Sequence, residues 1–193
     1  MIQRLAKKFV DFQITKGYLG EAERNKYVYA YELTINQSIN LFLTFILAVV
    51  FGEVHSVTLF LVLYIPLRKY SGGFHADSNE KCILYSAFAI VGVIFANKIL
   101  MACNYDSRLG LAINCLLMIY VNIMAPIEVN NKKISSIERR KYKRYVHLIT
   151  LIHMALLVVN GMLIQLKFVH IVIFMTYVLM FLLLIIEQMK RTE

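Results

Sequence analysis

Long runs of apolar residues dominate the chain, and short charged or polar connections separate them. A membrane-spanning helix needs about 20 mostly apolar residues, whereas a soluble core is built from shorter periodic segments. The pattern therefore predicts one all-α integral membrane domain over residues 1–193, a polytopic helical bundle with six spans at 30–51, 54–67, 83–102, 109–127, 146–165 and 169–187. The second span is short and ends at Pro66, so we expect it to be tilted or re-entrant.

The N-terminal segment repeats apolar residues at helical spacing, with Arg4, Lys7 and Lys8 between them. This predicts a basic amphipathic helix lying on the membrane surface, and a frayed basic tail is the alternative. The segment has no uninterrupted apolar core followed by a small-residue cleavage site. We therefore expect it to stay on the mature protein and not to be a removable signal peptide.

Basic residues gather in alternate connections. Six precede the first predicted span, seven lie between Lys132 and Arg144, and the turn near Glu53 and His55 has none. Because basic residues favour the cytoplasmic side, both termini and the connection after the second span are predicted to be cytoplasmic.

Composition agrees with a membrane domain, since 59% of the residues are hydrophobic and the mean hydropathy is +0.62. The net charge is +9, but the basic residues lie beside apolar blocks, where topology and anionic lipid explain them better than nucleic acid does. We expect the lipid bilayer as a partner and no nucleic acid. Cys82, Cys103 and Cys115 are an odd number with no C-x-x-C pair, so at least one thiol is predicted to be free.

One connection concentrates glycine, histidine, acid and thiol, in the run from Arg68 to Cys82. Gly72 and Gly73 permit positive φ, so a tight turn is expected there. Asp77 or Ser78 is placed to cap a helix that starts at one of these two residues.

Cys82 is then close to the N-terminus of that helix and follows Lys81, so the helix dipole and a cation both favour its thiolate. On one continuous helix, seven residues would separate His75 from Cys82 by about 10.5 Å of rise, which is too far for a hydrogen bond. The helix must therefore begin after His75, so that the imidazole can act as general base to the thiol.

Other readings of the same residues are weaker. A zinc site made by His75, Asp77 and Cys82 lacks a fourth partner nearby, so we expect no metal and no cofactor. The other two cysteines, and the other histidines, have no comparable neighbourhood and are expected to be structural.

The pattern Arg68-x-x-x-Gly72-Gly73-x-His75-Ala76-x-Ser78-x-x-x-Cys82 resembles the signature of the accessory gene regulator B (AgrB) family of bacterial quorum-sensing peptidases. Chain length, basic side and hydrophobic layout resemble the family as well. The resemblance implies a thiol protease in the cell membrane of a Gram-positive bacterium, with His75 and Cys82 as catalytic residues. Its partner would be an AgrD-type propeptide, processed to a thiolactone or lactone autoinducer, and a homodimer is one assembly left open.

Supporting roles are assigned more loosely. Glu32, Asn36 and Asn40 recur at i, i+4 and i+8 on one predicted helix face, which must point into the bundle. Interhelical hydrogen bonding is the more common use of such a stripe. Glu32 and Asp77 are nevertheless the two residues that could orient His75.

The densest basic cluster includes Lys132, Lys133, Arg139 and Arg140, on the same predicted side as the thiol. It can contact anionic lipid, or steer the acidic C-terminal tail that AgrD-type propeptides share.

A small transporter or channel for a peptide or ion is the main rival function, because the polar stripe could line a path. A membrane scaffold without activity is the second. Neither explains why glycine, histidine and cysteine share one connection.

Overall fold

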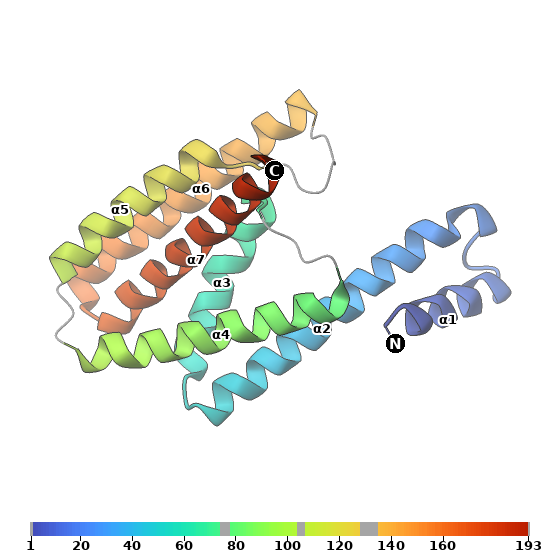
Figure 1. The fold of residues 1–193 in the computed structure, drawn as a ribbon, viewed down its shortest axis with the longest axis horizontal. Coiled ribbons are helices and arrows are strands. Elements are labelled where there is room, and N and C mark those ends of the chain that lie inside the picture. Colours follow the sequence, from blue (N-terminus) through green and yellow to red (C-terminus); the bar gives the residue numbers. More distant parts are fainter. Residues whose placement is uncertain (1, 74–77, 104–106, 128–134, 193) are drawn as a thin grey trace.

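The computed structural model describes residues 2–73, 78–103, 107–127 and 135–192, which form seven α-helices and no strand (Figure 1). The helices are α1 (Ile2–Thr15), α2 (Arg24–Val50), α3 (Val54–Ser71), α4 (Asn79–Ala102), α5 (Ser107–Met124), α6 (Ser136–Val159) and α7 (Lys167–Thr192). A 3-10 turn, η1 (Glu21–Glu23), precedes α2, and a π-helical turn, η2 (Asn160–Ile164), joins α6 to α7. The predicted all-α class is confirmed.

Each predicted span falls on one of the helices α2 to α7. Among the described residues, four helical segments are long and apolar enough to cross a membrane: Glu21–Val50, Asn79–Ala102, Ser136–Leu163 and Lys167–Lys190. The apolar helix Leu109–Met124 is shorter. These helices fit a multi-pass membrane protein, while the number of six spans stays a prediction.

Helix α3 does not end at Pro66 but continues to Ser71. A proline inside a helix removes one backbone donor and crowds the preceding turn, which is why the sequence suggests an end there. Leu63 and Leu67, on either side of the proline, are almost fully buried. Their packing stabilises the helix through Pro66, and the extra turn carries Arg68 to the end of the bundle.

The core of the bundle lies along α3 and α7. Phe60 and Leu67 of α3 and Tyr177 and Leu184 of α7 are nearly inaccessible to solvent. Many large apolar side chains instead lie on the outer surface, for example Phe42, Phe88 and Leu116. An apolar exterior around a packed interior is the arrangement expected of helices surrounded by lipid.

Helix α1 packs along the first half of α2, away from the other helices (Figure 1). Ala6 and Val10 are buried against Val28, and Gln13 Nε2 donates a hydrogen bond to Tyr31 Oη at 2.6 Å. The predicted N-terminal helix is therefore present and is not a frayed tail. Its contact with lipid stays a prediction.

The bundle has two ends that matter for function. At the end that we call the Cys82 end, α3, α5 and α7 finish while α4 and α6 begin. At the opposite end, which we call the Glu53 end, the α2–α3 turn meets the last turn of α4 and the start of α7.

Candidate active site at the Cys82 end

The chain turns sharply after α3 through two glycines, as predicted. Gly72 has φ +71° and Gly73 has φ +106°. The Ile127 amide, just beyond α5, donates to Ser71 O at 3.0 Å, and Gly72 forms an isolated parallel bridge with Ile127. A Cβ on Gly72 would overlap the Ile127 carbonyl. The end of α3 and the segment just beyond α5 are therefore hydrogen-bonded to each other.

The Arg68 side chain extends over the C-terminal end of α3 and stabilises this turn. Its Nη1 donates to Gly72 O, and its Nη2 donates to Gly73 O at 3.1 Å. A Cβ on Gly73 would lie 2.6 Å from Nη1. Arg68 thus binds two carbonyls left free at the helix end, a common role for a cation there.

Electrostatics connect Arg68 to Cys82. Burial lowers the pKa of the Arg68 guanidinium, and the charges of Tyr64, Glu187 and Cys82 act in the opposite direction. The charges of Arg68 and Cys82 therefore interact across the Cys82 end of the bundle. The guanidinium is half-buried, so its interactions with these charges are screened less than in bulk water.

Helix α4 begins where the sequence predicts, and Ser78 is its cap. The Ser78 hydroxyl oxygen accepts a hydrogen bond from the Lys81 amide at 3.2 Å, and α4 starts at Asn79. The Cys82 amide donates to Ser78 O at 2.9 Å. Cys82 therefore lies in the first turn, as a half-buried free thiol at the positive end of the helix dipole.

Four predicted site residues, His75, Asp77, Lys132 and Lys133, lie outside the described residues. The distance between His75 and Cys82 therefore stays a prediction.

The other predicted basic residues lie at the start of α6. Arg139 and Arg140 are exposed in its first turns, which a capping box of Ser135 and Glu138 stabilises. A hollow of about 430 Å³ is lined by Ile137, Arg140, Lys141, Arg144 and Tyr145. The Tyr145 ring lies 4.6 Å from the Tyr70 ring near the end of α3, so the basic start of α6 adjoins the glycine turn.

Glu32 is half-buried on α2 and, among the described residues, makes no hydrogen bond or ion pair. Asn36 is buried and Asn40 half-buried, so the predicted polar stripe does face inward. His75 and Asp77 lie outside the described residues, so the role of Glu32 in orienting His75 stays a prediction.

Glu187 is a site residue that the sequence analysis missed. It is 4% exposed, lies near the end of α7, and its charge acts on Arg68. An ionisable residue at the end of a predicted span was the available signal, because such residues usually mark function or a buried partner.

Together these features define an all-α membrane protein with a thiol at a helix N-terminus and a half-buried arginine whose charge interacts with it. The sequence model of the family described as AgrB, accessory gene regulator B, matches residues 2–188. The chain belongs to this family.

Two Clostridium perfringens proteins named AgrB-like are similar to this chain. The one from strain SM101 is 24% identical and the one from strain 13 is 25% identical, each over 146 residues that make up 73% of this chain and 68% of the relative. No solved structure matches the chain. Family membership gives the protein a role in agr quorum sensing, in which the AgrB family takes part in processing the AgrD propeptide.

Proposed function

We propose that the protein is a cysteine endopeptidase that removes the C-terminal tail of an AgrD-type propeptide, with Cys82 as nucleophile and His75 as general base. One observation carries the proposal: Cys82 lies in the first turn of α4, where the partial positive charge of the helix N-terminus and the charge of Arg68 both act on it.

The reaction needs a thiol as nucleophile and a base to take its proton. His75 takes the Sγ proton, and Sγ attacks the carbonyl carbon of the scissile peptide bond. The C–N bond breaks, His75 returns the proton to the leaving amine, and a thioester joins the propeptide to Cys82. A cysteine or serine of the same peptide then attacks the thioester, which forms the thiolactone or lactone ring and frees Cys82.

Neighbouring groups support these steps. Backbone amides in the first turn of α4 can donate to the oxyanion of the tetrahedral intermediate. Arg68 holds the Gly72 and Gly73 carbonyls, which fixes the direction in which the chain leaves α3 toward His75. The basic start of α6 adjoins this turn and can attract an acidic tail.

The test is propeptide cleavage in membranes by the unaltered protein and by Cys82→Ala and His75→Ala. We expect both variants to lose cleavage by at least about a hundredfold, as removal of a nucleophile or general base does. A hydroxylamine-sensitive enzyme–peptide adduct should form only when Cys82 is present.

Cys103→Ala and His55→Ala are the matched controls, because both lie at the Glu53 end, and they should cleave normally. Normal cleavage by Cys82→Ala would contradict the mechanism and leave transport or a scaffold role as the function to pursue.

A further inference from the structure

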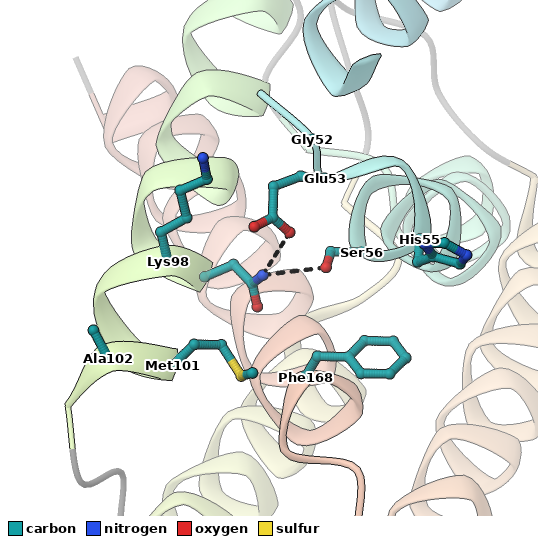
Figure 2. Close-up of a pocket in the computed structure, with 9 residues that line it drawn as sticks. Gly52, Glu53, His55, Ser56, Lys98, Met101, Ala102 and Phe168 are labelled. Atoms are coloured by element: carbon teal, nitrogen blue, oxygen red, sulfur yellow. Dashed lines mark hydrogen bonds between the residues drawn. The ribbon is translucent and has the colours of Figure 1, made fainter. Parts of the chain in front are cut away.

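A second polar site lies at the Glu53 end of the bundle, opposite Cys82. A pocket of about 610 Å³ is formed there by the α2–α3 turn, the last turns of α4 and the start of α7 (Figure 2). Glu53, Asn97, Met101 and Phe168 are among the residues that line it. Nothing in the proposed peptidase reaction uses this end.

The orientation of the Asn97 side chain is fixed by two hydrogen bonds. Its Nδ2 donates to Glu53 Oε2 at 2.9 Å and to Ser56 Oγ at 3.1 Å, which the dashed lines in Figure 2 mark. Both N–H groups of the amide are therefore used. Because the amide is planar, its oxygen points away from Glu53 and Ser56.

That oxygen has no partner. Asn97 is 2% exposed, and its Oδ1 is buried without a hydrogen bond among the described residues, although Asn97 lines the pocket. A buried acceptor that lacks a donor is destabilising. The wall of the pocket therefore contains a buried acceptor that lacks a donor.

The other lining groups define the chemistry of that donor. The Glu53 carboxylate adds negative charge and a second acceptor, and Figure 2 shows Met101 and Phe168 on another side of the same pocket. Calcium and magnesium require six or more oxygen ligands, which a thioether and a phenyl ring do not supply. A cation with N–H donors and an apolar body fits better, because a ring face attracts such a cation.

Lys98 also lines the pocket but has a different partner. Its Nζ lies over the Phe51 ring, 5.7 Å from the ring centroid. We propose that this pocket binds a primary ammonium group carried on an apolar body, with Asn97 Oδ1 and the Glu53 carboxylate accepting its N–H donors.

The test uses the absence of tryptophan from the chain. Phe168→Trp places a single indole at the pocket, and its fluorescence is followed while n-butylammonium is added to the full chain in detergent. Tetramethylammonium keeps the charge without N–H donors, and 1-butanol keeps the body without the charge. Phe12→Trp, on the exposed face of α1, reports unspecific partitioning into the micelle.

We expect the fluorescence of Phe168→Trp to change saturably with n-butylammonium and not with tetramethylammonium or 1-butanol. Phe12→Trp should show no saturable change with any of the three. Adding Glu53→Gln keeps the size of the side chain and should weaken binding about tenfold or more, the effect of losing a charge-assisted hydrogen bond. Glu21→Gln makes the same change on an exposed residue in η1 and should have no effect. Calorimetry on the unaltered chain repeats the titration without the indole.

An equal response to 1-butanol or tetramethylammonium, or unchanged binding in Glu53→Gln, would overturn the proposal. Saturation by Na⁺ or Ca²⁺ that n-butylammonium does not displace would do the same, in favour of a metal site. The readout is independent of propeptide cleavage, so it succeeds or fails separately from the peptidase.

Discussion

Gly72 and Gly52 both have a positive φ angle, but they differ in the space that surrounds the position of a Cβ atom. Their φ angles are +71° and +69°, in the region that L-residues with a side chain avoid. Around Gly52 a Cβ would meet open space, whereas at Gly72 it would overlap the Ile127 carbonyl. The pair therefore separates backbone strain from steric overlap.

We predict that Gly52→Ala lowers the free energy of unfolding by about 1–2 kcal/mol, through backbone strain alone. Gly72→Ala adds the overlap and should lose about 3 kcal/mol or more, together with propeptide cleavage. Thermal denaturation in detergent measures the loss of stability in both variants, and the membrane assay measures the loss of propeptide cleavage in Gly72→Ala. Equal losses of stability in the two variants would show that Ile127 does not constrain Gly72.

The contacts of Arg68 show where prediction from sequence stops at the scale of residues. The glycine turn was predictable because positive φ is a local property of Gly72 and Gly73. Glu187 was not paired with Arg68, since their separation along the chain leaves no local signal and only the packing of α7 against α3 brings their charges together.

At the scale of elements, the starts of α4 and α6 are built alike. Ser78 and Ser135 each accept a hydrogen bond at 3.2 Å from the amide three residues later. Such a cap contributes about 1 kcal/mol to helix stability. Only α4 carries the proposed nucleophile in its first turn.

We predict that Ser78→Ala and Ser135→Ala each lower the free energy of unfolding by about 1 kcal/mol. Only Ser78→Ala should slow alkylation of Cys82 by iodoacetamide, by about two- to fivefold, because it frays the helix N-terminus, whose partial positive charge stabilises negative charge nearby. The rate is measured by mass spectrometry with Cys103 and Cys115 replaced by serine.

Ser78→Asn keeps an acceptor at the cap and should restore the rate of Ser78→Ala. If Cys82 is alkylated at the same rate in all these variants, the helix N-terminus does not contribute to its reactivity.

The predicted elements agree with the structure where local rules decide them. Apolar blocks placed α2 to α7, and the residue types before Asn79 placed the start of α4. The end of α3 could not be predicted in the same way. Pro66 indicates an end by its own chemistry, and the buried Leu63 and Leu67 outweigh it through contacts with other helices.

At the scale of the whole molecule, the two ends of the bundle differ in charge and in chemistry. The basic start of α6 and the glycine turn share the Cys82 end, and the ammonium pocket occupies the other. Two free cysteines mark these ends, since Cys82 is in the first turn of α4 and Cys103 is exposed just after its last. The proposed orientation, with the Cys82 end in the cytoplasm, can therefore be tested with the native thiols.

We predict that a membrane-impermeant maleimide added to intact cells labels Cys103 and not Cys82, because basic residues keep the Cys82 end inside. Permeabilised cells should allow labelling of both, as judged by mass spectrometry of the purified chain. Cys103→Ser is the control and should abolish labelling from outside. Labelling of Cys82 in intact cells would show that the predicted topology is reversed, and it would not bear on the proposed chemistry of the site.

Helix α1 has a consequence for how the protein would meet an AgrD-type propeptide. Phe12 is exposed on α1, and the Lys16 Nζ lies 5.9 Å from the centroid of its ring, which suits a helix lying flat on a lipid surface. If the propeptide rests on the same lipid surface, the two molecules find each other by diffusion in a plane and not in a volume. Their encounter rate then depends on molecules per area of lipid. Adding empty vesicles that take up propeptide should slow processing, although no bulk concentration of enzyme or peptide has changed.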